Sequence, residues 1–212
     1  SALGATTSKQ REDGVLVINF GGGCTNWTAY VGKVPRCVGG IPIGGDHLTF
    51  DIQCATKTNH ETAEKIKKQA GSATLITEKQ RLQFKNNFSD QSILVSDLSK
   101  ITNARMDETI RIIHEQVANS GCLNMLSAGV VICGGGAALK NITTLVSNIF
   151  QLPCTIANPE VLYKNLKPNH PTTAYATLLG AAKCCTRESL AYAATQKRRR
   201  PLSKLFEKPL YR

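Results

Sequence analysis

The segment that most constrains the fold is Val15-Leu16-Val17-Ile18-Asn19-Phe20-Gly21-Gly22-Gly23-Cys24-Thr25-Asn26. Its apolar, β-branched first half predicts a buried strand over 14–20, and the three glycines predict a tight turn directly after it. Successive glycines let backbone N–H groups approach an anion, because no Cβ blocks the way, and Thr25 adds a hydroxyl donor. The pattern is typical of a phosphate-binding turn, but glycine-rich turns also occur without any ligand.

A second strand with a glycine turn lies later in the chain. Residues 129–133 predict another buried strand, which runs into Gly134, Gly135 and Gly136. A glycine turn between a strand and a helix lets a flat ligand pack against the backbone. The two turns together are stronger evidence for a ligand site than either turn alone.

The remaining pattern predicts an α/β layer fold with a mixed sheet. Strands over 27–34 and 36–43 would complete a three-stranded meander with the first strand. Helices are predicted over 47–57 with Asp46 as N-cap, from 59 or 60 to 70, and over 99–120, 141–150 and 171–185. Segments 74–76, 93–95 and 153–157 look like strands, and 159–170 looks like a loop.

Composition sets broad limits on the class of protein. The chain has 212 residues, of which 42% are hydrophobic and 19% are charged, as in ordinary soluble domains. This length suits one large domain or two small subdomains. No apolar run approaches the roughly 18 residues that span a bilayer, which excludes an integral membrane protein. The composition also excludes a collagen-like, disordered or repeat-solenoid chain.

Positive charge gathers at the end of the chain. The formal net charge is +11, and residues 197–212 hold seven basic residues against one acidic residue. The basic block is Lys197, Arg198, Arg199 and Arg200, and Leu202, Leu205 and Phe206 follow it at positions i, i+3 and i+4. An apolar stripe beside a basic block predicts contact with an anionic membrane surface. A nucleic-acid tail and a solvated end are the competing interpretations, and the scarcity of aromatic residues disfavours base stacking.

The cysteine pattern favours a reduced compartment. The chain has eight cysteines but no Cys-x-x-Cys pair, so a zinc or redox site has no support in the sequence. No signal-peptide pattern opens the chain. We therefore expect free thiols and a cytoplasmic location.

Four segments in order resemble the FtsA family of actin-like bacterial cell-division proteins. They are 21–25, then 41–52 with its Ile-Pro-Ile-Gly-Gly-Asp string, then 63–67 and 128–136, and residues 173–180 look like the closing helix of the family. The resemblance covers about residues 1–185. It implies an α/β, actin-like (ribonuclease H-like) lobe with a mixed five-stranded sheet flanked by helices and a small inserted subdomain.

The resemblance implies only the second lobe of that family, made of subdomains IIA and IIB. Residues 1–13 would be the end of the interlobe helix, 14–57 and 121–186 the IIA-like nucleotide-binding subdomain, 58–120 the IIB-like subdomain, and 187–212 a basic tail with a membrane-targeting segment. We therefore expect the chain to be a fragment of a longer protein or a split gene product.

The same resemblance assigns an ATP site. It makes Gly21, Gly22, Gly23, Cys24 and Thr25 the second phosphate loop, and Gly134, Gly135 and Gly136 the turn that contacts adenosine. Glu64 and Lys67 match the helix positions that reach the ribose and base, and their i, i+3 spacing puts them on one helix face. A plain surface Glu–Lys contact is the alternative for that pair.

Asn19 departs from the family pattern, which has an aspartate at this position. The aspartate helps to hold the water shell of Mg²⁺, a hard cation that prefers charged oxygen ligands. Asparagine keeps the shape but removes the charge. The expectation is ATP binding in the full-length protein, with Mg²⁺ binding and hydrolysis weak or absent.

The function implied is a nucleotide-binding scaffold that anchors FtsZ filaments to the cytoplasmic membrane during bacterial cell division. Arg105 is the expected contact for the FtsZ C-terminal peptide, since a guanidinium suits acidic groups, and an ordinary solvated helix charge is the alternative. The expected location is peripheral, on the inner face of the membrane. Self-association into actin-like filaments would require the first lobe, and no nucleic-acid partner is expected.

Three other functions compete with this one. A pilus-assembly relative of FtsA would bind a short peptide from a membrane protein. An enzyme of the same superfold, such as a sugar kinase, would need substrate carboxylates facing the cleft, and none are matched. A basic nucleic-acid-binding module would show salt-sensitive binding to DNA but not to anionic vesicles.

Overall fold

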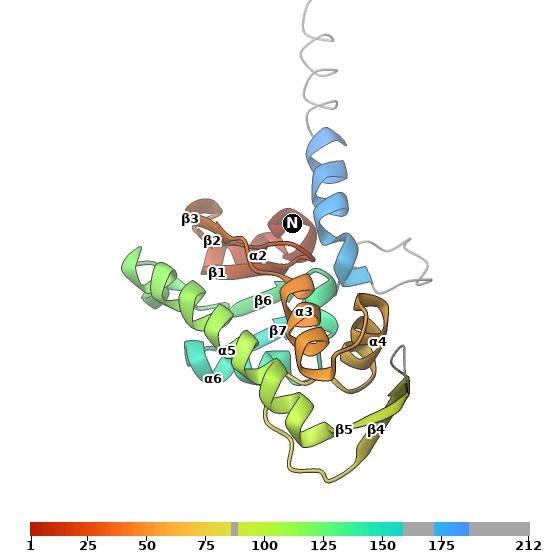
Figure 1. Ribbon diagram of the computed structural model, residues 1–212. Coiled ribbons are helices and arrows are strands. Elements are labelled where there is room, and N and C mark those ends of the chain that lie inside the picture. Colours follow the sequence, from red (N-terminus) through yellow and green to blue (C-terminus); the bar gives the residue numbers. More distant parts are fainter. Residues whose placement is uncertain (86–88, 159–171, 187–212) are drawn as a thin grey trace, which may run out of the picture.

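A mixed five-stranded sheet forms the centre of the molecule (Figure 1). The computed structural model describes residues 1–85, 89–158 and 172–186. The strands are β1 (Val15–Phe20), β2 (Thr25–Val31), β3 (Val34–Ile41), β6 (Val130–Cys133) and β7 (Cys154–Ile156), in the order β3-β2-β1-β6-β7. Strands β1 to β3 form an antiparallel meander, whereas β1, β6 and β7 run parallel. The predicted mixed five-stranded sheet is therefore confirmed.

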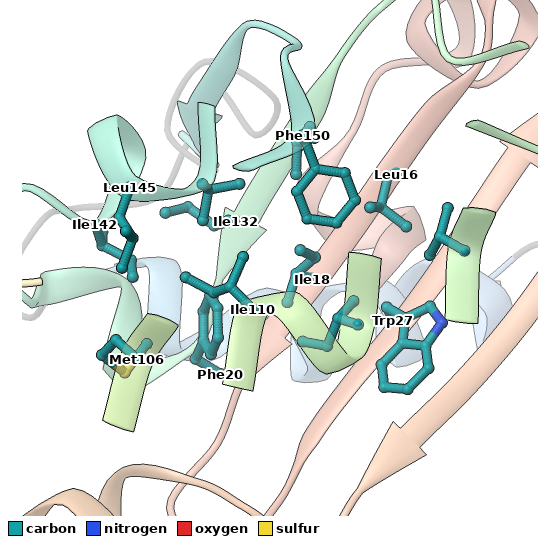
Figure 2. Packing of buried hydrophobic residues seen from close by; sticks show 14 of the residues in the cluster. Leu16, Ile18, Phe20, Trp27, Met106, Ile110, Ile132, Ile142, Leu145 and Phe150 are labelled. Atoms are coloured by element: carbon teal, nitrogen blue, oxygen red, sulfur yellow. The ribbon is translucent and has the colours of Figure 1, made fainter. Parts of the chain in front are cut away.

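The central strand β1 contributes to hydrophobic clusters on both faces of the sheet. Leu16, Ile18 and Phe20 lie on one face, and Val15 and Val17 lie on the other, as the two-residue period of a strand requires. The first face packs against α5 (Val95–Asn119) and α6 (Ile142–Phe150). Figure 2 shows labelled side chains of this cluster, from the sheet and from both helices.

The second face is covered near the N-terminus. Helix α1 (Ala2–Ala5) and the helix over 176–186 meet there, and Figure 1 shows the latter in blue beside the N-terminus. An ideal Cβ on Gly4 would lie 2.0 Å from the carbonyl oxygen of Ala176, so the two backbones touch. Helix α2 (Ser8–Asp13) follows, and the Thr7 hydroxyl accepts a hydrogen bond from the backbone N–H of Gln10 at its start.

A smaller hydrophobic cluster lies beside the sheet. It joins α3 (Gly45–Thr56), α4 (His60–Ala70), the first turns of α5 and the hairpin of β4 (Arg81–Lys85) and β5 (Asp90–Leu94). Its buried members are Ile52, Ala63, Ile66, Ala70, Val95 and Leu98. The Asn59 side chain accepts from the Thr62 N–H at 2.8 Å, so Asn59 is the N-cap of α4, which begins at His60 as one of the two predicted starts.

The long helix α5 connects the two clusters. Val95 and Leu98 near its start belong to the smaller cluster, whereas Ile110 and Val117 near its end belong to the sheet core. The change from the smaller cluster to the sheet core thus falls near the middle of α5, whereas residue 120 is the expected end of the IIB-like subdomain. The subdomain boundaries expected from the resemblance remain a prediction.

Several elements differ from the sequence prediction. Residues 74–76 form no strand, because the Ile76 N–H donates to the Ser99 hydroxyl and the neighbouring Ala73 N–H donates to the Lys140 carbonyl. Helix α5 begins at Val95 rather than 99, and the hairpin before it was not predicted as a unit. Helix α3 begins at Gly45 with Gly44 as N-cap, so Asp46 lies in the first turn instead.

Short 3-10 helices complete the structure: η1 (Leu123–Met125), η2 (Gly135–Ala138) and η3 (Thr172–Tyr175). The predicted closing helix therefore begins with η3 and continues as an α-helix over 176–186. The predicted loop over 159–170 lies outside the described residues, as does the basic tail.

Candidate functional site: a cleft between two glycine turns

A cavity of about 380 Å³ lies where both glycine turns meet α3, α4 and α5. Its volume falls within the usual range of small-molecule sites. The lining residues are Phe20, Gly21, Gly22, Thr25, Ile43, Gly44, Gly45, Asp46, Leu48, Glu64, Lys67, Lys68, Gly71, Arg105, Met106, Thr109, Gly135, Gly136, Ala138, Leu139 and Lys140. Residues that lie far apart in the sequence and were assigned to one site thus share one cavity.

The first glycine turn is fixed by backbone contacts with the start of α3. The carbonyls of Gly21 and Gly22 accept hydrogen bonds from the N–H groups of Gly45 and Asp46, both at 2.9 Å. A Cβ on Gly44 would lie 2.2 Å from the Gly22 carbonyl oxygen, so only glycine fits there. Gly44 therefore lets the two backbone segments touch, whereas a side chain at Gly45 would meet only ordinary contacts at 3.6 Å.

The residues predicted for the first turn differ in whether they line the cavity. Gly21, Gly22 and Thr25 line the cavity, whereas Gly23 and Cys24 are exposed and do not. Thr25 is fully buried, and its hydroxyl donates to the Ile43 carbonyl at 2.7 Å. In this structure that hydroxyl links β2 to the segment before α3.

The second glycine turn packs directly on the end of β1. Gly134 has φ +89°, and a Cβ there would lie 2.3 Å from the Phe20 carbonyl oxygen. A Cβ on Gly136 would lie 2.6 Å from the Phe20 Cβ. Gly135 and Gly136 line the cavity, while Gly134 sits behind them and donates its N–H to the Thr173 carbonyl at 3.0 Å.

Glu64 and Lys67 form a polar cluster on the α4 wall. Their side chains pair at 2.5 Å, and the Lys67 ammonium also donates to the Thr49 hydroxyl and the Gly45 carbonyl. Glu64 further lies 2.6 Å from the Thr49 hydroxyl and 3.3 Å from the Lys68 ammonium. Burial alone would raise the pKa of Glu64, but hydrogen bonds from Lys67 and Thr49 lower it to about 2. The carboxylate is therefore ionised at neutral pH.

Asn19 lies at the end of β1 but does not line the cavity. Its side-chain oxygen accepts a hydrogen bond from the Cys133 thiol on the neighbouring β6, with 3.6 Å between the heavy atoms. Burial raises the pKa of Cys133 to about 11, so this thiol keeps the proton that it donates. The amide oxygen of Asn19 is thus directed toward β6.

Arg105 also lines the cavity, although its predicted role was elsewhere. Its guanidinium forms a two-point ion pair with Asp51 of α3, at 2.6 and 3.0 Å, and contacts Glu108 at 2.8 Å. The hydrogen bonds that its guanidinium donates to Asp51 raise the pKa of Arg105. In this structure Arg105 ties α5 to α3, and its proposed contact with a peptide remains a prediction.

Sequence reasoning missed several residues of this cavity. Asp46 belongs to the Ile-Pro-Ile-Gly-Gly-Asp string but was given only a capping role, and Lys140 follows the second turn without any assigned role. Met106 and Thr109 come from the apolar face of α5, whose pattern signals core packing alone. The proximity of this helix to the glycine turns has no local signal in the sequence.

Other expectations concern metals and membranes. Within residues 1–85, 89–158 and 172–186, no group of three or more histidine, cysteine, aspartate or glutamate side chains could hold a metal ion. No helix in the same described part of the chain combines the length and apolar character needed to cross a bilayer. The predicted membrane-targeting residues, Lys197, Arg198, Arg199, Arg200, Leu202, Leu205 and Phe206, lie outside the described residues.

Solved structures with the same arrangement confirm the actin-like fold. MreB5 of Spiroplasma citri bound to AMPPNP superposes with a TM-score of 0.74 at 20% identity, over 91% of this chain and 59% of that chain. The PilM-PilN type IV pilus biogenesis complex gives a TM-score of 0.62 at 14% identity, over 82% of this chain and 46% of that chain. At these identities the likeness concerns the fold alone.

Sequence comparison identifies the family. The family model described as "Cell division protein FtsA" matches residues 16–180. The FtsA of Borreliella burgdorferi is 33% identical over 161 residues, which cover 73% of this chain and 39% of that protein. The FtsA of Helicobacter pylori is 30% identical, over 77% of this chain and 35% of that protein. The chain thus spans less than half the length of these relatives, and it belongs to the FtsA family of cell division proteins.

Proposed function

We propose that this chain is a nucleotide-binding lobe of an FtsA-type protein, and that its cavity holds ATP. One observation carries the proposal: both glycine turns and the Glu64–Lys67 pair meet around one cavity of about 380 Å³. The first turn would hold the phosphates, and the second turn would support the adenosine. Glu64, held by Lys67 and Thr49, would face the ribose.

The residues present fit such a ligand in shape and charge. Gly135 has no atom within 4 Å of an ideal Cβ, so the second turn leaves open space on its surface. Lys68 and Lys140 also line the cavity, and their positive charge favours an anionic ligand in the cavity as a whole. Asn19 adds no charge, and we propose that hydrolysis by this lobe is therefore weak or absent.

Family membership supports the wider role. We propose that the whole protein is a peripheral membrane scaffold of bacterial cell division that binds the FtsZ C-terminal peptide, associates into actin-like filaments, and lies on the cytoplasmic face of the membrane. The support is the FtsA family match over residues 16–180. The pilus-assembly alternative has support only from the shared fold.

Titration calorimetry with ATP, with and without Mg²⁺, tests the nucleotide site. We expect micromolar binding to this chain, and an Asn19→Asp variant should gain more from Mg²⁺ because it adds a carboxylate at the strand end. An absence of ATP binding to both proteins would contradict the proposal and leave the lobe as a scaffold.

A further inference from the structure

We propose that Asp46 supplies the carboxylate for a divalent cation that enters with the phosphates of the nucleotide. This inference rests on the proposed nucleotide site and adds a residue to it. It assigns the metal side of the site to the start of α3, where Asp46 lies, rather than to the end of β1, where Asn19 lies.

Asp46 lies directly beside the first glycine turn. Its backbone N–H donates to the Gly22 carbonyl at 2.9 Å, which holds the start of α3 against the first glycine turn. An ideal Cβ on Gly22 would lie 3.2 Å from one carboxylate oxygen of Asp46 and 3.5 Å from the other. The carboxylate therefore stands directly beside the turn that we assign to the phosphates, and it lines the cavity.

The two carboxylates that line the cavity differ in their partners. Two carboxylates line the cavity, Asp46 and Glu64. Glu64 already contacts Lys67, Lys68 and Thr49. Among the described residues, no basic side chain lies within ion-pair distance of Asp46, and no group donates a hydrogen bond to its carboxylate. Asp46 is thus the lining carboxylate that can take a new cation.

A divalent cation would offset the repulsion between the Asp46 carboxylate and the phosphates of a nucleotide. Asp46 is exposed to solvent, so water weakens but does not remove the repulsion between its carboxylate and a triphosphate bound beside it. A divalent cation between the two removes the repulsion, and Mg²⁺ in proteins is held by one or two carboxylates together with substrate phosphates. A site built this way binds the metal complex of the nucleotide in preference to the free nucleotide.

Calorimetry on this chain and three variants of it tests the inference. ATP is titrated in Mg²⁺ and in EDTA into the unchanged chain, Asp46→Asn and Asp90→Asn. The last is a matched control that removes the same charge from an exposed position on β5. Mg²⁺ should tighten ATP binding about tenfold in the unchanged chain and in Asp90→Asn, but about twofold or less in Asp46→Asn, and Asp46→Glu should restore most of the gain.

A second readout follows the metal itself. Electron paramagnetic resonance of Mn²⁺ with ATP should report a protein-bound Mn²⁺–ATP complex with the unchanged chain, and a several-fold smaller bound fraction with Asp46→Asn. Emission of the buried Trp27 checks that each variant is folded.

The outcomes separate the two proposals. If ATP binds but Asp46→Asn keeps the full Mg²⁺ gain, or if Mg²⁺ gives the unchanged chain no gain, the role of Asp46 is overturned while the nucleotide site stands. If no version of the chain binds ATP under either condition, the nucleotide site is wrong and the role of Asp46 falls with it.

Discussion

At the scale of single residues, the cavity depends on groups whose contacts are already satisfied inside the lobe. Glu64, Lys67 and Thr49 hold each other in place, and Lys67 also reaches back to the Gly45 carbonyl. A carboxylate held from three sides has few rotamers available, so it presents a fixed oxygen to a ligand. The same contacts make Glu64 a contributor to stability.

Glu64→Gln should remove a pH-dependent part of the free energy of unfolding. The pKa of Glu64 is about 2 in the folded protein and near 4.5 when unfolded, so its contribution is complete above pH 4.5 and is lost as the pH falls toward 2. We expect the variant to be about 1–2 kcal/mol less stable at pH 7, with the difference shrinking below pH 4.5. Urea unfolding followed by Trp27 emission measures this.

Glu61→Gln is the matched control for that experiment. Glu61 lies on the same helix and pairs with Lys65, but its side chain is 77% exposed. Exposed pairs contribute little, so this change should cost much less stability at pH 7 than Glu64→Gln does. Equal losses in the two variants would show that the Glu64 contacts are not specially stabilising.

At the scale of elements, helix α5 determines how the cavity is closed. Its second half packs on the sheet, and Arg105 near its middle pairs with Asp51 of α3. Arg105 and Asp51 are both less than one-third exposed, and a two-point guanidinium–carboxylate pair resists sliding of the two helices. The ion pair therefore fixes the distance between the α3 and α5 walls.

A double-mutant cycle on Arg105→Ala and Asp51→Ala should give a coupling energy of about 1–2 kcal/mol in urea unfolding. Arg105→Lys should recover less than half of the loss, because an ammonium cannot make the two-point contact. The exposed Arg111–Asp107 pair on the same helix serves as the comparison, and its coupling should be clearly smaller because solvent screens it. A coupling near zero for Arg105 and Asp51 would mean that hydrophobic packing alone sets this distance.

The elements also show where sequence reasoning succeeds and fails. The strand–glycine–strand pattern correctly predicts β1 to β3, because buried strands with glycine turns have a strong local signal. The false strand at 74–76 arises because its backbone is bonded outside any sheet: the Ile76 N–H donates to the Ser99 hydroxyl of α5, and the neighbouring Ala73 N–H donates to the Lys140 carbonyl. Long-range partners of this kind leave no trace in local periodicity.

At the scale of the whole molecule, the fold brings five segments to one cavity, whose lining residues lie within 20–25, 43–48, 64–71, 105–109 and 135–140. The glycine turns and the Glu64–Lys67 pair were predictable as members of one site only through the family resemblance. Asp46, Met106 and Lys140 were not predicted as members, because their positions depend on how α3 and α5 pack. The sequence therefore identified the two glycine turns and the Glu64–Lys67 pair as neighbours, but it did not identify the helix walls around them.

Gly135 offers the most direct test that this cavity is the nucleotide site. It lines the cavity, its φ is not in the left-handed region, and no atom lies within 4 Å of an ideal Cβ. Gly135→Val should therefore keep the stability of the lobe while filling space meant for the ligand. Ala55→Val, at an exposed position on α3, is the control for the added apolar surface.

The measurement is the affinity for ATP with Mg²⁺, by titration calorimetry, on the unchanged chain and on these two variants. The account predicts micromolar binding to the unchanged chain and to Ala55→Val, and at least about tenfold weaker binding to Gly135→Val. Equal affinity of Gly135→Val and the unchanged chain, with the variant folded by Trp27 emission, would contradict the claim that ATP binds between the two glycine turns.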